Sequence, residues 1–232
     1  YNEEDETVKK VAEETTNTIR RLPYTTPNYT VENGTTLLET PEGAMPIEVF
    51  GAHNLNNLAG AKWICQNMGV DEADFYEAIA SFKGASKRLE KIAEGKGRVA
   101  YKDFAHSPSK VAATTKAVKE QYPNRTLVAC LELHTYSSLN AEFLKEYEGA
   151  LEYADEAVVF YSPDAVKIKQ LEEVTYEQIA KAFNREDLII YTNPAEFKQY
   201  LFNRNLDNSA LLLMSSGNYG GLNFDEVKQL IE

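Results

Sequence analysis

The sequence is poor in several residue types that mark particular functional classes. It contains two cysteines, three histidines and one tryptophan among 232 residues. Cys65 and Cys130 lie in apolar stretches without a CxxC or metal-ligand spacing, so we interpret both as buried free thiols in a reducing compartment. The sequence alone leaves a disulfide between them open.

Positive charge is also scarce. There are 24 lysines and arginines against 36 aspartates and glutamates, a formal net charge of −12, and the basic residues form no stripe. This balance argues against a nucleic-acid partner. Apolar runs such as Ala210–Met214 are far too short to span a bilayer, and no signal peptide is visible. We therefore expect a cytoplasmic protein with no nucleic-acid or membrane partner, while its oligomeric state stays open.

What is present falls into two parts, 1–83 and 84–232. The first part has apolar residues at helical spacing near its N-terminus and an Asn33-Gly34 dipeptide between β-rich runs, a strong hairpin signal. Two helices are predicted to follow, at about 54–68 and 72–82, with Asp71 capping the second. This part is too small and too mixed to predict an independent domain.

The second part alternates regularly between strands and helices. Short apolar strands between helices predict a parallel α/β sheet covered on both faces, in a Rossmann-like domain. The expected strands cover 87–94, 98–105, 126–133, 156–161, 187–192 and 209–216, and the expected helices cover 107–122, 140–153, 175–183, a segment from 193, and 224–232.

Polar loops follow three of these strands: Asp103–Pro108, Glu132–Ser138 and Ser215–Gly221. In open α/β sheets ligands bind beyond the carboxyl ends of the strands, so these loops are candidates for a site. Each also has a structural interpretation: Ser107 as a helix cap, His106 as a loop filler and the glycines as tight turns. GNYGG matches neither the phosphate loop nor the dinucleotide fingerprint. The argument for a site is that two of the three histidines and the densest glycine cluster meet at one predicted edge.

A second polar cluster opens the helix predicted at 54–68. Asn54 and Asn57 are three residues apart, so they face the same side of its first turn. A carboxamide both donates and accepts hydrogen bonds, which suits the edge of a nucleobase, and the free N–H groups of a helix start favour an anionic ligand. The structural alternatives are an N-cap role for Asn54 and a core position for His53.

Three segments, in this order, resemble motifs of the Mur ligase family, the ATP-dependent amide ligases of peptidoglycan synthesis. Gly51–Asn54 with Asn57 is similar to the family's GxHNxxN element in the central ATPase domain. Phe82–Gly84 with Lys87–Glu90 resembles the element that enters the C-terminal domain, and Tyr101–Pro108 resembles D-[DY]-[YF]-A-H-x-P. The resemblance covers almost the whole chain, and its motifs are specific in combination.

This resemblance implies a domain plan and a reaction. Residues 1–83 would be the C-terminal part of the central ATP-binding domain, and 84–232 the Rossmann-like Mur ligase C-terminal domain. Residues 89–108 and 214–227 are most similar to the branch that joins UDP-N-acetylmuramate to the murein tripeptide L-alanyl-γ-D-glutamyl-meso-diaminopimelate in peptidoglycan recycling. The branch that adds L-alanine is the nearest alternative. In both, ATP with Mg²⁺ activates the muramate carboxylate as an acyl phosphate, which the incoming amine attacks.

The resemblance also assigns roles to residues. It places Asn57 at the adenine, Arg88 at the phosphates and Asp103 at the ribose. It implies no catalytic group and no metal ligand within this chain, because the family's phosphate loop and magnesium ligands would precede Tyr1. The full ATP set is His53, Asn54, Asn57, Arg88 and Asp103, and the peptide set is His106, Ser107, His134, Ser216, Gly217, Asn218, Gly220 and Gly221.

Two other interpretations stay open at this stage. One is another amino-acid ligase of the same family, for example of the folylpolyglutamate type, and the other is a non-catalytic Rossmann-like binding module. The chain begins without methionine, as if inside a longer protein, and contains no GxxxxGK[ST] sequence. We therefore expect that these residues alone have no ligase activity.

Overall fold

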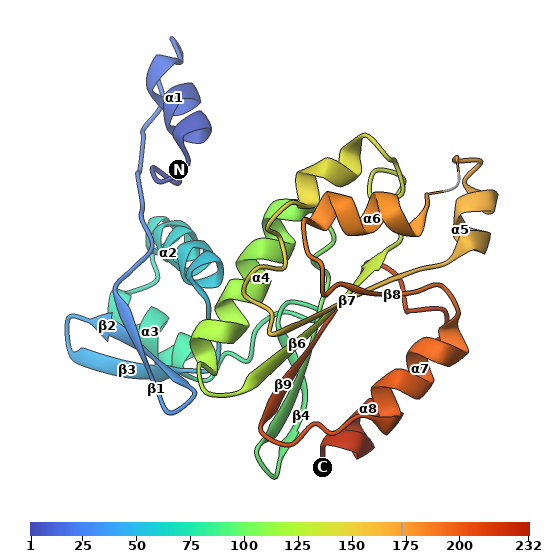
Figure 1. Ribbon diagram of the computed structural model, residues 1–232. Coiled ribbons are helices and arrows are strands. Elements are labelled where there is room, and N and C mark those ends of the chain that lie inside the picture. Colours follow the sequence, from blue (N-terminus) through green and yellow to red (C-terminus); the bar gives the residue numbers. More distant parts are fainter. Residues whose placement is uncertain (173) are drawn as a thin grey trace. The chain divides into compact units, whose positions relative to one another are not determined.

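The computed structural model describes residues 1–172 and 174–232 and divides the chain into two compact units, Tyr1–Gly84 and Ala85–Glu232 (Figure 1). Each unit has its own secondary structure and its own core. The first contains α1 (Glu6–Glu14), β1 (Tyr29–Glu32), β2 (Thr35–Thr40), β3 (Gly43–Ile47), α2 (Ala52–Asn67) and α3 (Glu72–Ala80).

The first unit is built on an antiparallel meander of β1, β2 and β3. Asn33 and Gly34 join β1 to β2 with φ values of 51° and 78°. Positive φ at both central residues is what a type I′ hairpin turn requires, which explains the Asn-Gly pair and confirms the predicted hairpin. The core of the unit joins the sheet to α2 and α3 through Leu38, Ile47, Leu55, Leu58 and Phe75.

Helix starts in this unit agree only in part with the sequence pattern. Asp71 caps α3 as predicted, accepting a hydrogen bond from the Ala73 N–H at 2.8 Å. α2 begins earlier than expected, with Gly51 at the N-cap position and a φ of 86°. Asn54 therefore lies within the first turn, and its structural interpretation as the N-cap is wrong. α1 ends at Glu14, and none of its residues is buried.

The second unit contains the α/β domain. Its elements are β4 (Glu90–Gly95), β5 (Arg98–Asp103), α4 (Pro108–Gln121), β6 (Thr126–Leu133), the 3₁₀-helix η1 (Phe143–Tyr147), β7 (Glu156–Tyr161), α5 (Pro163–Ile168), α6 (Tyr176–Phe183), β8 (Ile189–Tyr191), α7 (Pro194–Asn203), β9 (Ser209–Met214) and α8 (Phe224–Ile231).

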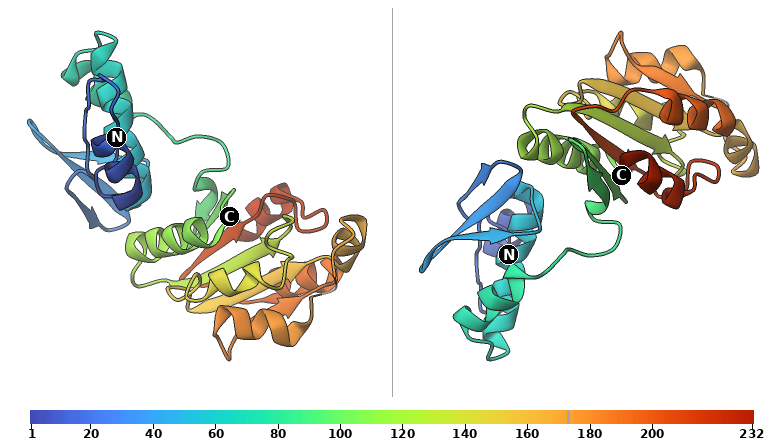
Figure 2. Two further views of the ribbon diagram at one scale, coloured as in Figure 1. Left: turned by 90° about the horizontal axis from the view of Figure 1, so that it is seen from above. Right: turned by 90° about the horizontal axis from the view of Figure 1, so that it is seen from below.

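These strands form one sheet in the order β4-β5-β9-β6-β7-β8. All neighbours are parallel except β4, which runs antiparallel to β5, so the sheet is mixed rather than purely parallel. α4, η1 and α6 cover one face, while α7 and α8 cover the other (Figures 1 and 2). Leu211 and Leu213 of β9 belong to the core under α7 and α8. The predicted α/β sheet with both faces covered is confirmed.

Two segments differ from the sequence prediction. The helix expected at 140–153 is only the single 3₁₀-helix η1, followed by turns in which Gly149 adopts a φ of 73°. A glycine in the left-handed conformation ends a helix, and the apolar pattern is instead buried by packing, with Tyr147 stacked on Phe183 at 5.2 Å. The short helix α5, which Ser162 caps, was not predicted.

The two thiols also differ from each other. Cys130 lies in the middle of β6 with no exposed surface, and burial raises the pKa of its thiol to about 12. Cys65 is only partly buried, so the prediction of a buried thiol is wrong there. Both are free cysteines.

An ion pair between Arg204 and Glu156 connects the end of α7 to β7, and its contribution to stability depends on pH. Arg204 donates to Glu156 Oε2 at 2.7 Å, and the Tyr200 hydroxyl donates to the other carboxylate oxygen. The hydrogen bond from Arg204 holds the pKa of Glu156 below its ordinary value of 4.5. Because the folded-state pKa is depressed, the stabilisation is present above about pH 4.5 and is lost as the pH falls through the lower folded-state value.

We therefore expect Glu156→Gln to reduce the free energy of unfolding at pH 7 by about 1–3 kcal/mol, the range for a hydrogen-bonded charged group. The difference from the parent should shrink steadily as the pH is lowered below 4.5. Urea melts followed by circular dichroism across this range provide the measurement. Glu152→Gln, at an exposed position on a nearby turn, is the control. A pH-independent difference would contradict the assignment.

Candidate functional site

The three polar loops meet at the carboxyl end of the parallel strands. β9 lies between β5 and β6, and Met214 at its end is level with both Asp103 and Leu131. The chain leaves β5 and β6 toward the face of α4 and η1, but it leaves β9 toward α8 on the opposite face. In open α/β sheets, ligands bind where adjacent loops turn to opposite faces in this way, so this edge of the sheet is the candidate site.

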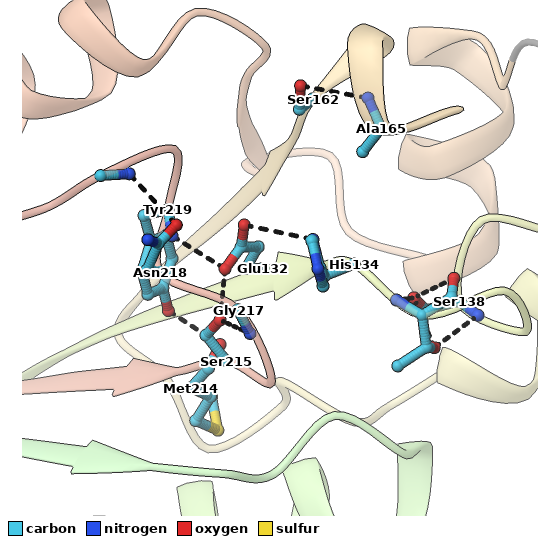
Figure 3. A network of polar contacts seen from close by, with 12 residues as sticks. Glu132, His134, Ser138, Ser162, Ala165, Met214, Ser215, Gly217, Asn218 and Tyr219 are labelled. Carbon is cyan, nitrogen blue, oxygen red and sulfur yellow. Dashed lines mark hydrogen bonds and ion pairs between the residues drawn. The ribbon is translucent and has the colours of Figure 1, made fainter. Parts of the chain in front are cut away.

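A buried carboxylate, Glu132, connects two of these loops (Figure 3). The residue is 3% exposed near the end of β6. Its Oε2 accepts hydrogen bonds from the Ser215 hydroxyl and, at 2.9 Å, from the Tyr219 N–H. The Tyr219 hydroxyl donates to the Cys130 and Met214 carbonyl oxygens at 2.7 and 2.8 Å. This network fixes the loop after β9 against the end of β6.

His134 faces the other oxygen of the same carboxylate. Its Nδ1 lies 3.7 Å from Glu132 Oε1, and its side chain is 41% exposed. A Cβ at Gly217 would lie 2.8 Å from Glu132 Oε2 and 3.1 Å from His134 Cγ, so the loop backbone can approach this closely only with glycine. The arrangement places a partly exposed imidazole next to a buried carboxylate at this edge of the sheet (Figure 3).

Two backbone N–H groups of the glycine-rich loop donate to acceptors within the same loop. The Gly217 N–H donates to the Ser215 hydroxyl at 2.7 Å, and the Gly221 N–H donates to the Asn218 carbonyl oxygen at 3.0 Å. Within 1–172 and 174–232, the buried Ser216 hydroxyl has no hydrogen-bond partner. The glycines therefore give the loop its shape, and the Asn218 side chain contributes to that shape because its Oδ1 accepts the Gly221 N–H at 3.2 Å.

The loop after β5 holds three of the predicted site residues. Asp103 is 7% exposed, and its two oxygens accept from the Leu89 and Ala105 N–H groups, each at 2.6 Å. His106 packs edge-on against Phe104 at 5.1 Å, and its Nδ1 lies 2.8 Å from the Phe104 carbonyl oxygen. The Asp103 carboxylate thus organises its own loop first, and its predicted contact with ribose stays a prediction.

Ser107 occupies the N-cap position of α4, but among the described residues its side chain makes no capping hydrogen bond. It instead lines a cavity of about 920 Å³ between the start of α4 and η1. Hydroxyl, amide, aromatic and carboxylate side chains share this wall: Ser107, Pro108, Ser109, Tyr136, Ser137, Asn140, Glu142, Phe143, Glu146 and Leu171. Ser107 therefore stands at the N-cap position without making the capping hydrogen bond, and its hydroxyl is available to a ligand.

Arg88 is an exposed cation at the start of the second unit. Its guanidinium carbon lies 5.2 Å from the centre of the Phe104 ring, and Nη1 donates to the Lys87 carbonyl oxygen at 3.0 Å. The ring and the carbonyl orient the guanidinium and leave its other N–H groups for an anion. The geometry fits the phosphate contact predicted for Arg88.

In the first unit, Asn57 differs from its neighbours. The Asn54 amide donates to the Phe50 carbonyl oxygen at 3.0 Å, and the Asn56 amide contacts Asn2, Glu4 and Thr26. The Asn57 side chain makes no hydrogen bond within the described ranges. It lines a cavity of about 780 Å³ together with Tyr24 and Trp63. An unpaired carboxamide beside aromatic rings fits the edge and face of a purine, whereas Asn54 serves the local structure first.

No set of histidine, cysteine, aspartate and glutamate side chains in the described part of the chain could hold a metal ion. The described residues therefore offer no site for the Mg²⁺ that the family resemblance implies. In the same part of the chain, no helix has the length and apolarity that crossing a bilayer would require.

Comparison with known proteins identifies the family. Residues 87–217 match the family model described as Mur ligase, glutamate ligase domain. The chain belongs to the Mur ligase family. UDP-N-acetylmuramate–L-alanine ligase of Gloeothece citriformis is 30% identical over 186 residues, which are 76% of this chain and 37% of the relative. The corresponding Microcystis aeruginosa protein is 31% identical over 185 residues, again 76% and 37%. The chain thus spans little more than a third of these curated relatives.

Solved structures show the same fold. UDP-N-acetylmuramate-alanine ligase of Thermotoga maritima aligns with a TM-score of 0.63 at 16% identity, over 88% of this chain and 44% of that one. A murein peptide ligase of Psychrobacter arcticus aligns with a TM-score of 0.57 at 20% identity, over 85% and 42%. Folylpolyglutamate synthase of Mycobacterium tuberculosis, solved with ADP, aligns with a TM-score of 0.54 at 16% identity, over 82% and 44%.

The Mur ligase resemblance is therefore confirmed, and with it the α/β fold. The finer prediction of the murein-peptide branch is not decided, because the curated Mur ligases above are named for L-alanine. Sequence reasoning gave no role to Glu132, Ser215 or Tyr219. A carboxylate within the apolar run TLVACLEL was the available signal, since a charge in a buried strand needs partners.

Proposed function

We propose that this chain is part of an ATP-dependent Mur ligase that joins an amino substrate to the carboxylate of UDP-N-acetylmuramate. The observation that carries the proposal is the edge of the sheet at the carboxyl end of β9, within the matched Mur ligase domain. Three loops from neighbouring strands meet there: the loop of His106 and Ser107, the loop of His134 and the glycine-rich loop. Arg88 lies against Phe104 of the first of these loops. ATP supplies the phosphoryl group that activates the carboxylate.

The residues divide by chemistry into two sets. Asn57 would contact the purine with its free carboxamide, and Arg88 would contact the phosphates with a permanent positive charge. The remaining ATP residues are His53, Asn54 and Asp103. The amino substrate would contact Ser107 in the large cavity and the partly exposed His134 in the loop after β6. The remaining residues of this set are His106, Ser216, Gly217, Asn218, Gly220 and Gly221.

We further propose that the amino substrate is a murein peptide. The cavity at Ser107 is about 920 Å³, and drug-sized ligands occupy pockets of roughly 300–1,000 Å³, so a tripeptide can use this space while a single alanine leaves most of it empty. The wall carries hydroxyl, amide, carboxylate and aromatic side chains, which can hydrogen-bond to a peptide and pack against it. L-alanine is the second candidate, because it is the substrate in the names of the curated relatives.

The two candidates predict opposite substrate preferences. We expect the complete gene product to use L-alanyl-γ-D-glutamyl-meso-diaminopimelate with a kcat/KM at least about tenfold higher than L-alanine, a ratio equivalent to roughly 1.4 kcal/mol of transition-state binding. The measurement is UDP-N-acetylmuramate-dependent ADP release with each amine varied in turn. A preference for L-alanine would assign the protein to the other branch. The chain of 232 residues, assayed in parallel, is expected to release no ADP.

A further inference from the structure

The backbone around Arg88 adopts an unusual double bend. Lys87 and Leu89, on either side of it, have φ values of 55° and 44°, in the left-handed region that residues with a Cβ avoid. Neither is glycine, asparagine or aspartate, the residues that enter this region most readily. Two such residues flanking one exposed arginine mean that surrounding contacts impose the conformation.

The first of those contacts is Glu90. Its Oε2 accepts the Lys87 N–H at 2.7 Å and the Ser86 hydroxyl at 3.1 Å, while Oε1 pairs with Lys102 Nζ at 2.8 Å. Glu90 and Lys102 are directly opposite on the antiparallel strands β4 and β5. The pair therefore belongs to the rigid sheet, and it holds the Lys87 amide from that sheet.

Two further contacts close the bend. Asp103 holds the Leu89 N–H at 2.6 Å, and the Phe104 N–H donates to the Lys87 carbonyl oxygen at 2.9 Å. Phe104 is the same residue whose ring lies under the Arg88 guanidinium. The bend thus places Arg88 over a fixed aromatic ring at the beginning of the loop Asp103–Pro108.

We propose that Glu90 is a positioning residue for Arg88: by holding the left-handed Lys87, it fixes the guanidinium over Phe104. Partial burial would raise the pKa of the Glu90 carboxyl, but the Lys102 ammonium and the hydrogen bonds from Lys87 and Ser86 keep this pKa below its ordinary value. Glu90 is therefore negatively charged at neutral pH. The functional consequence rests on the proposed role of Arg88 at the ATP phosphates. Glu90 itself contacts no substrate, and its effect passes through the backbone at Lys87.

The test uses NMR of the 232-residue chain, with the ring-current shift of the Arg88 side chain over Phe104 as the structural readout. We expect Glu90→Ala to abolish this shift. The double variant with Glu90→Ala and Lys87→Gly should show the ring-current shift again, because glycine adopts a positive φ without a hydrogen bond to Glu90. Glu90→Gln, which keeps one oxygen for the Lys87 N–H, should retain part of it. Glu94→Ala, on the same strand and paired with Lys91 instead, is the control and should leave it unchanged.

The same variants are then titrated with ADP. In Glu90→Ala, the ADP concentration that gives half of the change in the Arg88 signals should rise by roughly tenfold. In the double variant it should return toward the wild-type value. An Arg88 shift that survives Glu90→Ala would overturn the proposal, as would a double variant that fails to recover the shift. If the shift follows the expected pattern but ADP leaves Arg88 unaffected in every protein, the proposed phosphate contact fails while the positioning role of Glu90 stands.

Discussion

Arg88→Ala is expected to lower the kcat/KM for ATP in the complete gene product by about 30- to 1,000-fold, or roughly 2–4 kcal/mol. The reason is the loss of a charge that is oriented in advance. Arg88 is held over Phe104 at 5.2 Å and by the Lys87 carbonyl oxygen, so its guanidinium needs little rearrangement when charge develops on the phosphates.

Two variants separate this role from general effects of charge. Arg88→Lys keeps the positive charge but loses the planar group that stacks on Phe104, so we expect an intermediate defect. Lys116→Ala removes an exposed cation from α4. The ion pair of Lys116 with Glu120 is long, at 3.7 Å, and its loss should leave ATP use unchanged. Steady-state kinetics with ATP varied provide the measurement. Wild-type ATP use by Arg88→Ala would remove Arg88 from the proposed nucleotide site.

Gly220→Ala is expected to destabilise the second unit by about 2–4 kcal/mol, much more than the same change at the next residue. Gly220 has a φ of 69°, and a Cβ there would lie 2.5 Å from Pro194 Cγ and 2.9 Å from Pro194 Cβ. A left-handed alanine costs roughly 1–2 kcal/mol, and forcing the loop away from the start of α7 costs typically 1–3 kcal/mol more. The two costs overlap as the loop shifts.

Gly221→Ala is the matched control. Gly221 has a φ of 104°, but a Cβ there would meet no atom within 4 Å, so alanine carries a backbone cost without a steric clash. Thermal and urea unfolding of both variants give the comparison. Equal stability losses would mean that the loop does not pack on Pro194 as described. The result also bears on the peptide set, because a folding defect at Gly220 would lower peptide use without any direct contact.

The sequence predicted the order of strands and helices in the second unit because that order depends on local patterns. Apolar strands such as Thr126–Leu133, and proline at the start of α4 and α7, leave few alternatives. The prediction of a parallel sheet was wrong for β4, because the connection between Gly95 and Arg98 is too short for a parallel crossover. The short η1 was harder to foresee, because it depends on the packing of Tyr147 against Phe183.

The candidate site was predictable in its location but not in its internal contacts. The three loops were expected at one end of the sheet, since parallel strands bring their carboxyl ends together. The hydrogen bonds that Glu132 accepts from Ser215 and Tyr219 depend on the tertiary register between distant strands. The bond between Glu90 and the Lys87 N–H spans only three residues, but it needs the left-handed backbone at Lys87, which the sequence does not indicate. A motif comparison identifies Arg88, but it carries no information on the left-handed residues that flank it.

The central claim is that this chain serves an ATP-dependent ligase acting on UDP-N-acetylmuramate. The most direct test is to measure ADP formation by the complete gene product with ATP, Mg²⁺ and the murein tripeptide, with and without UDP-N-acetylmuramate. The account predicts that ADP forms only when the sugar nucleotide is present, in a one-to-one ratio with the ligated product. ADP formation that is independent of UDP-N-acetylmuramate, or none with either the tripeptide or L-alanine, would contradict it.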